Sequence, residues 1–236
     1  MSGAMSAIMP PQIVPLELAE FSFANDEPLA GQTGVVMAYA VRHSTGVLLF
    51  DTGFGFGNDE VDQMYHPRAR RIPDVLAGAQ IDVAHVDAVV NCHLHIDHAG
   101  QNSFFPNVPI YVQRDEWHVA HSEDHTILEW IDFPNATYEM RSGDYDLFPG
   151  VRAISTPGHT PGHQSLVVEA ADGLTVLAGQ AVNSSAEWIG EVGAREGRSR
   201  AWDRAAYDRS VQRLRALEPA RVYFAHDSQS WAALPV

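Results

Sequence analysis

Apolar residues recur along the chain in short runs that polar or glycine-containing segments separate. Several runs are nearly continuous rather than alternating, which is typical of strands covered on both faces. The pattern predicts strands at Val35–Val41, Val47–Phe50, Asp87–Asn91, Pro109–Val112, Val151–Ile154, Ser165–Val168, Leu174–Ala178 and Arg221–Ala225. A hairpin turn is predicted at Ala170–Leu174 (AADGL), between two of these strands.

A helical period is clearest between Asp203 and Leu217, where Asp203 can cap the first turn. One face of this segment is apolar and carries Tyr207, Val211 and Leu214. Shorter helices are predicted at Pro73–Ala79 and Asp115–His121. The irregular stretch Phe54–Ile72, rich in Gly, Phe and Arg, is predicted to be a long surface loop.

The order of these elements bears on the domain organisation. Strands in two groups with interspersed helices favour a layered α/β fold. No internal repeat, low-complexity linker or shift in composition marks a domain boundary. We therefore expect one domain over residues 1–236, with residues 1–12 forming a flexible leader.

The composition narrows the class of partner. A net charge of −15 argues against a nucleic-acid partner and against an anionic membrane surface, since both are held by Lys and Arg. Cys92 is the single cysteine of the sequence, so no internal disulfide can form. Neither a secretion signal nor an apolar run of about 20 residues is found. These features predict a cytoplasmic protein that acts on a small molecule.

Polar side chains gather where the predicted strand Asp87–Asn91 ends, in the segment VVNCHLHIDHAGQN. In an extended chain, residues two apart point the same way, so His93, His95 and Asp97 are expected to converge, with His98 turned toward a second point. Imidazole nitrogens with one carboxylate suit Zn²⁺ or a similar first-row ion. The alternative is that these are ordinary surface or core histidines. Three histidines and an aspartate within six positions at a strand end make this alternative the less common one.

Two further strand ends supply histidines. His159 and His163 follow one strand in STPGHTPGHQS, and His226 follows another in VYFAHDSQ. Histidines brought by three strand ends to one rim are typical of a site built on a rigid scaffold. The remaining histidines lack such company and are interpreted as solvated or structural: His43, His66, His85, His118, His121 and His125.

Four motifs together resemble the metallo-β-lactamase superfamily. HLHIDHAG is similar to its H-x-H-x-D-H signature. The others occur in the order that the superfamily shows: DTG at Asp51–Gly53, TPGHTPGH at Thr156–His163 and AHD at Ala225–Asp227. The resemblance covers nearly the whole chain. It implies an α/β (α+β) fold of the four-layer αββα sandwich type, with a dinuclear metal centre at one edge.

The resemblance also implies which residues hold the metal. One ion would be held by His93, His95 and His159, and the second by Asp97, His98 and His226. Asp51 resembles the residue that orients a ligand histidine from behind, and His163 lies at a position that is usually structural. The expected cofactor is Zn²⁺, as one or two ions, with other first-row divalent metals as alternatives.

Within the superfamily the chain looks most like the N-acyl homoserine lactonases, in NCHLHIDHAGQNSFFPNVPIYVQRDEW and FPGVRAISTPGHTPGHQSLVVE. This likeness implies hydrolysis of a lactone or an ester by metal-activated water, with Asp97 passing a proton to the leaving alkoxide. The alternatives are a hydrolase of thioesters or phosphoesters with the same fold, and a non-catalytic ligand-binding homologue. Related lactonases often dimerise through the loop after DTG, and the aromatic residues of Phe54–Tyr65 are compatible with a homodimer.

Two positions depart from the family pattern. Gln180 stands where relatives usually carry an Asp that bridges the two ions, and Gln is neutral and offers one carbonyl oxygen. Gln180 could bind one ion, the second site could be weak, or the centre could be impaired. Asn183 stands where lactonases of this branch often carry a Tyr. It could hydrogen bond to a developing oxyanion or simply cap a loop.

Overall fold

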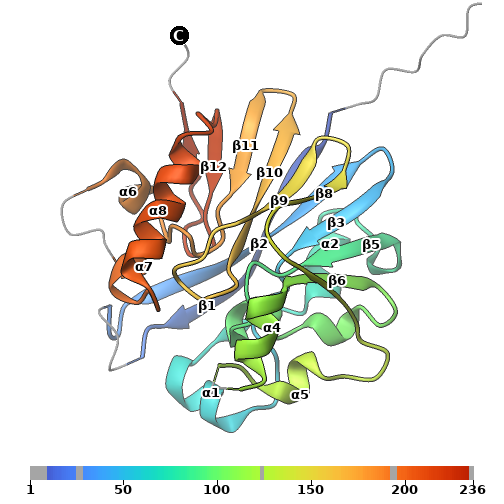
Figure 1. Ribbon diagram of the computed structural model, residues 1–236. Helices are drawn as coiled ribbons and strands as arrows, with labels where there is room; N and C mark the ends of the chain where they lie inside the picture. Colours follow the sequence, from blue (N-terminus) through green and yellow to red (C-terminus); the bar gives the residue numbers. More distant parts are fainter. Residues whose placement is uncertain (1–9, 25–28, 123–124, 192–195, 234–236) are drawn as a thin grey trace, which may run out of the picture.

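The computed structural model describes residues 10–24, 29–122, 125–191 and 196–233. Its described strands form two sheets, which lie face to face (Figure 1). The first sheet has the order β4-β1-β2-β3-β5-β6-β7. Its strands are β1 (Gln12–Ser22), β2 (Thr33–His43), β3 (Gly46–Phe50), β4 (Arg68–Ala69), β5 (Val86–Val90), β6 (Pro109–Gln113) and β7 (Thr137–Arg141).

The second sheet has the order β13-β12-β11-β10-β9-β8. Its strands are β8 (Tyr145–Phe148), β9 (Val151–Ser155), β10 (Gln164–Ala170), β11 (Gly173–Leu177), β12 (Arg221–Tyr223) and β13 (Trp231–Ala232). The helices are α1 (Asp59–Tyr65), α2 (Ile72–Gly78), α3 (Ile96–Ala99), α4 (Arg114–Ala120), α5 (Leu128–Ile131), α6 (Ser185–Ile189), α7 (Glu196–Ser199) and α8 (Arg204–Arg215). Two 3₁₀ turns lie at Val83–His85 and Asn102–Phe104.

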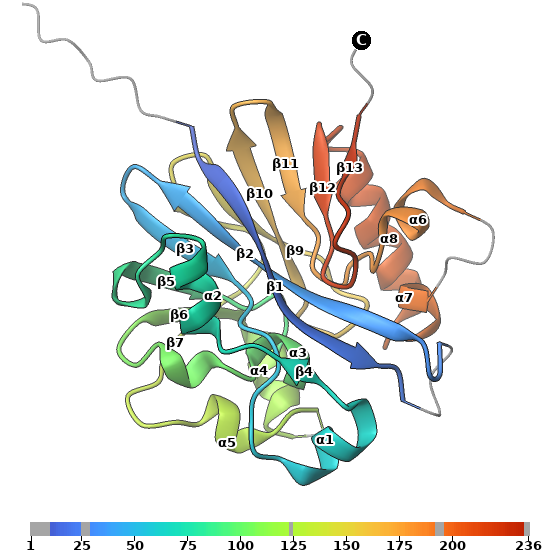
Figure 2. The ribbon, with the colours of Figure 1, turned by 180° about the vertical axis from the view of Figure 1, so that it is seen from behind.

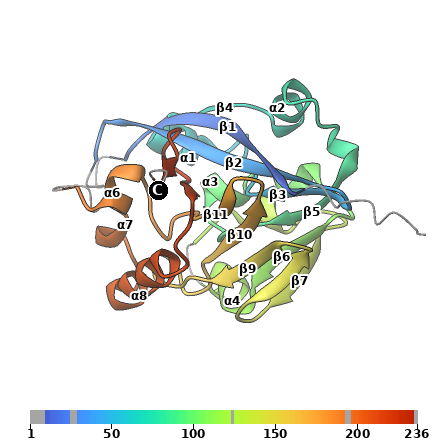
Figure 3. The same ribbon diagram turned by 90° about the horizontal axis from the view of Figure 1, so that it is seen from above.

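The four layers follow from the alternation of side chains along the strands. In β3, Leu48 and Phe50 are buried between the two sheets, whereas Leu49 is buried on the outer face of the first sheet. Residues of α2 pack on that outer face, and Leu214 of α8 packs with Val222 on the outer face of the second sheet. Figure 2 shows α2 in front of the first sheet, and Figure 3 shows α2 and α8 on opposite sides of the two sheets. The αββα arrangement is therefore confirmed.

The strand directions explain where a site can form. β3, β5 and β6 are parallel, so their carboxyl ends share one edge of the first sheet. β10 is antiparallel to both β9 and β11, and β11 is parallel to β12, so β9, β11 and β12 also end at one edge. The segments after β3, β5, β9, β11 and β12 carry the sequence motifs, so the topology brings residues far apart in sequence together.

One sequence-based prediction about the fold is wrong, and the end of another differs by one residue. The leader was expected to extend to residue 12, but β1 begins at Gln12 and pairs with β2 from Gln12 to Ser22. Pro15 within this run obscures the strand pattern. The segment Phe54–Ile72 is not one loop, because it holds α1, capped by Asn58, and β4, and its last residue begins α2. Residues 1–9 lie outside the described residues.

The other elements agree with the sequence pattern, with a few omissions. α8 has Asp203 as its cap, which accepts hydrogen bonds from the backbone N–H groups of Ala205 and Ala206. α2 and α4 lie within one residue of the predicted bounds. Besides β1 and β4, the sequence pattern misses β7, β8 and β13, which are partly exposed and lie at the sheet edges. It also misses the short helices α3, α5, α6 and α7.

Candidate metal centre

Three histidines form the first group of metal-binding atoms. One ring nitrogen each of His93, His95 and His159 lies within 4.8 Å of the others. His93 and His95 follow β5, and His159 follows β9, so both sheets contribute. His95 Nδ1 and His159 Nε2 are 3.2 Å apart. Two nitrogen lone pairs at this distance repel unless a proton or a cation lies near both, so the geometry fits a metal ion.

A carboxylate and two histidines form the second group. Asp97 Oδ2 lies 3.4 Å from His98 Nε2 and 3.4 Å from His226 Nε2. Both imidazoles are nearly closed to solvent, whereas the Asp97 side chain retains 15% exposure. His226 is oriented by its other nitrogen, Nδ1, which donates to the backbone oxygen of Val35 at 2.9 Å. This is the second trio that the family resemblance implies.

The prediction that Asp97 converges with His93 and His95 is wrong. The chain is not extended there: α3 begins at Ile96, so the residue spacing after His95 is helical and no longer alternating. Asp97 and His98 therefore lie next to each other at the second group rather than on opposite sides. His98 lies at the second group, and its role as a ligand there stays a prediction.

Buried atoms without hydrogen-bond partners test whether a metal ion fits. Among the described residues, His93 Nε2, His98 Nε2 and His226 Nε2 are buried and have no hydrogen-bond partner, and so is Gln180 Oε1. A buried polar atom without a partner costs about 1–3 kcal/mol, so several at one place are stable only if something else satisfies them. Imidazole nitrogens and an amide oxygen can all bind a divalent first-row ion. The residues present therefore fit a metal ion at each group.

Two of the candidate ligand histidines, His93 and His98, make contacts through their Nδ1 atoms. Asp51 is buried and has a left-handed backbone (φ 68°) at the end of β3. Its Oδ2 accepts a hydrogen bond from His98 Nδ1 at 3.0 Å, and its Oδ1 accepts one from the Cys92 backbone N–H at 2.7 Å. These are the contacts that the expected orienting role of Asp51 requires, and the role itself stays a prediction. The thiol of Cys92 lies with Sγ 3.0 Å from His93 Nδ1, a contact that the sequence did not indicate.

Gln180 lies directly after β11 and is almost completely buried. Its backbone N–H donates to His163 Nε2 at 3.0 Å, and His163 Nδ1 donates to Thr156 Oγ1 at 2.9 Å. Both ring nitrogens of His163 are therefore used within the protein, one by the Gln180 backbone and one by Thr156.

Asn183 is not among the described residues that line the cavity. Its backbone N–H donates to Glu187 Oε2 at 3.0 Å. Its Oδ1 is buried with no hydrogen-bond partner among the described residues. A contact between Asn183 and the substrate stays a prediction.

Burial and neighbouring charges favour neutral imidazoles at His93 and His159 and an ionised carboxylate at Asp97. Burial, followed by repulsion from neighbouring imidazoles, holds the pKa of His93 and that of His159 well below the ordinary value. Burial raises the pKa of Asp97, but His98, His226 and His95 outweigh it and the pKa lies below its ordinary value. Neutral imidazoles and an ionised carboxylate are the forms that bind metals.

The interpretation of His125 as solvated or structural is compatible with its contacts, but the sequence did not indicate that it lies against a candidate metal ligand. Its ring centroid lies 4.3 Å from that of His95, and its Nε2 donates to Glu116 Oε1 at 2.7 Å. Glu116 on α4 is fully buried and was not recognised in the sequence. The sequence around His125 has no periodicity that could reveal its contact with His95. This contact depends on the packing of the segment after β5 against the segment that holds His125.

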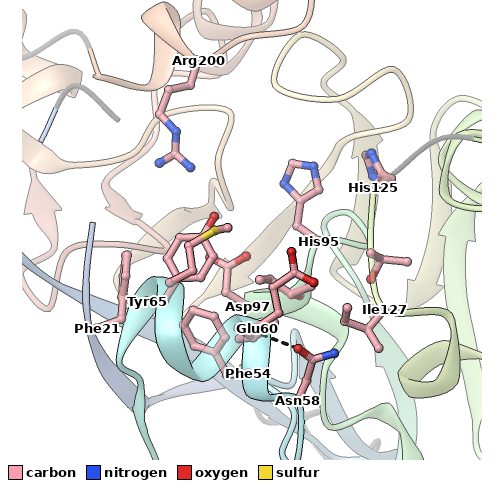
Figure 4. A pocket seen from close by; sticks show the side chains of 14 residues that line it. Phe21, Phe54, Asn58, Glu60, Tyr65, His95, Asp97, His125, Ile127 and Arg200 are labelled. Atoms are coloured by element: carbon pink, nitrogen blue, oxygen red, sulfur yellow. Dashed lines mark hydrogen bonds between the residues drawn. The ribbon is translucent and has the colours of Figure 1, made fainter. Parts of the chain in front are cut away.

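A cavity of about 320 Å³ opens beside the metal-binding atoms (Figure 4). One wall is mainly apolar and includes Phe21, Phe54, Val61, Met64, Tyr65 and Ile127. His95, Asp97 and His125 lie together on the polar side, and the Arg200 side chain points toward the cavity from the other side. The cavity thus combines candidate metal ligands with an apolar surface suited to a hydrocarbon chain.

Comparison with known families agrees with this geometry. Residues 31–226 match the family model described as the metallo-beta-lactamase superfamily. The chain belongs to this superfamily. The resemblance seen in four short motifs is thus confirmed over most of the chain.

Several members of the superfamily that are similar to this chain are lactonases. The chain is 32% identical over 207 residues to an N-acyl homoserine lactonase of Bacillus sp, covering 81% of each protein. It is 37% identical over 143 residues to one of Bacillus cereus, covering 59% of this chain and 55% of that protein. A solved N-acyl homoserine lactone hydrolase, with N-hexanoyl-L-homoserine bound at the catalytic metal center, superposes with a TM-score of 0.77. That structure is 26% identical, and the match covers 94% of both chains.

No helix among the described residues has both the length and the apolar character needed to cross a membrane. The cytoplasmic location stays a prediction.

Proposed function

We propose that this metallo-beta-lactamase superfamily member is a metal-dependent N-acyl homoserine lactonase. The observation that carries the proposal is the pairing of two metal-binding groups, His93–His95–His159 and Asp97–His98–His226, beside a cavity with an apolar wall. The relatives named above are lactonases, which supports this substrate class over other esters. Zn²⁺ is the proposed ion, because imidazole and carboxylate ligands suit it.

Bound at these groups, divalent ions would supply a Lewis acid for the lactone carbonyl and lower the pKa of a coordinated water. The protein's own residues then orient the substrate and move protons. Asp97 is ionised and lines the cavity, so we propose that it takes up a proton and delivers it to the alkoxide that leaves when the ring opens. The apolar wall of Phe21, Phe54 and Ile127 would hold the acyl chain and exclude water.

Gln180 is proposed as a neutral ligand through Oε1, which is buried and has no hydrogen-bond partner among the described residues. A neutral amide in place of a carboxylate removes one negative charge from the centre, so the second ion should bind more weakly than with Asp. In a non-catalytic homologue, Gln180 would bind no ion. A substitution at this position therefore distinguishes a metal-dependent lactonase from a non-catalytic homologue.

The test compares the purified protein with its Gln180→Asp variant, by metal analysis and by turnover of N-hexanoyl homoserine lactone. We expect both proteins to bind metal and open the lactone, with tighter binding of the second ion in the variant. A protein that binds no metal in either form, or that binds metal without opening any lactone or ester, would contradict the proposal. Turnover of thioesters or phosphoesters alone would support the rival hydrolase.

We also propose that the protein forms a homodimer through the segment after DTG. Phe56 and Met64 lie in this segment and are 47% and 46% exposed, which is unusual for large apolar side chains. Light scattering on the wild type and on Phe56→Ser would test this, and a monomeric wild type would contradict it.

A further inference from the structure

His125 and Thr126 form part of the cavity wall that the metal-binding groups do not use. Both line the cavity together with Ile127, in the segment between α4 and α5. His125 also contacts His95, with ring centroids 4.3 Å apart. These two side chains therefore lie between a candidate metal ligand and the apolar wall.

Glu116 fixes the orientation of His125. Its Oε1 accepts hydrogen bonds from the Leu94 backbone N–H at 2.9 Å and from His125 Nε2 at 2.7 Å. Its Oε2 accepts from Thr160 Oγ1 at 2.6 Å and from the Gly162 backbone N–H at 3.2 Å. Backbone N–H groups can only donate, so this carboxylate acts as an acceptor and the hydrogen on His125 lies at Nε2.

The same contacts make the arrangement rigid. Leu94 lies between His93 and His95, whereas Thr160 and Gly162 follow His159. One buried carboxylate thus joins both loops of the first metal-binding group to His125. A side chain held in this way loses little conformational entropy when it binds a ligand, which is what a recognition residue requires.

Two polar atoms remain available on this part of the wall. In a neutral ring with hydrogen on Nε2, Nδ1 is an acceptor, and His125 Nδ1 makes no hydrogen bond within the described part of the chain. Thr126 Oγ1 is buried and has no hydrogen-bond partner among the described residues. A hydroxyl can donate, so adjacent residues offer one acceptor and one donor.

We propose that His125 and Thr126 recognise the secondary amide of the substrate. His125 Nδ1 accepts the amide N–H, and Thr126 Oγ1 donates to the amide carbonyl oxygen. The inference rests on the proposed lactonase function and assigns the residues that would recognise the amide of its substrate. Such an amide joins the lactone, which must reach the metal-binding groups, to the acyl chain on the apolar wall. The position of His125 between these two regions matches that order.

The experiment compares three substrates: N-hexanoyl homoserine lactone, its N-methyl amide analogue, and γ-caprolactone, which has no amide. The proteins are the metal-loaded wild type, His125→Leu and Thr126→Val, with His121→Leu as a control. His121 is also a histidine of the α4 region, but it pairs with Asp132 and does not line the cavity. Metal content and thermal unfolding are measured for each protein.

We expect the wild type to prefer the N–H substrate over the N-methyl analogue, and His125→Leu to lose this preference. The loss of one hydrogen bond predicts a fall of about 3-fold to 10-fold in kcat/KM for the N–H substrate, mainly through KM. In His125→Leu and in Thr126→Val, kcat/KM for γ-caprolactone should fall less than kcat/KM for N-hexanoyl homoserine lactone. The Thr126→Val variant, which keeps the side-chain shape, should lower turnover of both amide substrates, since both retain the carbonyl.

The outcomes separate this inference from the function on which it rests. A wild type that opens all three lactones with no preference for the amide supports lactonase activity and overturns the amide site. Equal losses for all three substrates in His125→Leu would show that His125 only supports Glu116, which also overturns the inference. A wild type that opens none of the three contradicts the proposed function itself. If His125→Leu does not fold, Thr126→Val decides on the carbonyl half of the site.

Discussion

The Asp51 carboxylate joins the two sides of one loop: Oδ2 lies 3.0 Å from His98 Nδ1, and Oδ1 accepts the backbone N–H of Cys92. Cys92 precedes the first metal-binding group and His98 belongs to the second. A single buried residue after β3 therefore sets the position of the segment that carries four of the candidate ligands.

The Asp51→Asn variant should bind the second ion about 10–100-fold more weakly, because the amide cannot accept both hydrogen bonds with a full negative charge. Asn tolerates the left-handed backbone at this position, so the fold should be retained. Competition with a chromophoric chelator measures the affinity. Asp74→Asn, on α2, is the control. Unchanged affinity in Asp51→Asn would show that the carboxylate has no influence on the ion.

Removal of the metal should destabilise the protein. A ligand that binds only the folded state adds about 2.7 kcal/mol when its concentration is 100 times its dissociation constant. Treatment with a chelator should therefore lower the midpoint of thermal unfolding and abolish lactone turnover, and added Zn²⁺ should restore both. The same midpoint with and without chelator would contradict a metal-binding fold.

Glu116→Ala should destabilise the protein by about 3–5 kcal/mol, because it leaves four donors without an acceptor. These donors are the Leu94 and Gly162 backbone N–H groups, Thr160 Oγ1 and His125 Nε2. Denaturant unfolding measures the free energy. Glu129→Ala is the matched control, since Glu129 lies on α5 and is exposed. A loss below about 1 kcal/mol in Glu116→Ala would mean that water replaces the carboxylate.

Stability should fall in acid through His163. Burial lowers the pKa of His163 to about 3, and its Nε2 accepts the Gln180 N–H, a contact that a proton would abolish. The folded-state pKa lies below the unfolded value, so the unfolded chain binds the proton more readily. The contribution to stability is therefore present above about pH 6.5 and is lost as the pH falls toward about 3.

At about pH 5 this loss should reach about 2 kcal/mol relative to neutral pH. Denaturant unfolding of the wild type and of His163→Gln at both pH values isolates the effect, since the variant should depend less on pH. His85→Gln serves as the control, because the His85 side chain is 80% exposed. An equal pH dependence of all three proteins would show that His163 does not contribute.

The local sequence pattern was sufficient to predict most of the central strands, the start of α8 and the candidate ligand histidines. Nearly continuous apolar runs identified most of the central strands, because burial on both faces leaves a signature within a few neighbouring residues. Asp203 identified the start of α8 for the same reason, since a cap acts on the residues that directly follow it. The histidines at the strand ends could also be recognised, because strand and ligand are adjacent in sequence.

Contacts between distant segments could only be decided by the tertiary structure. Asp97 lies with His98 and His226 because the chain turns helical at Ile96 and because β12 ends at the same edge as β11. Glu116 accepts a hydrogen bond from Leu94, and His125 contacts His95, but neither pair shares a periodicity in the sequence. Periodicity reports the environment of neighbouring residues, whereas these contacts depend on how the sheets and loops pack, which no local pattern specifies.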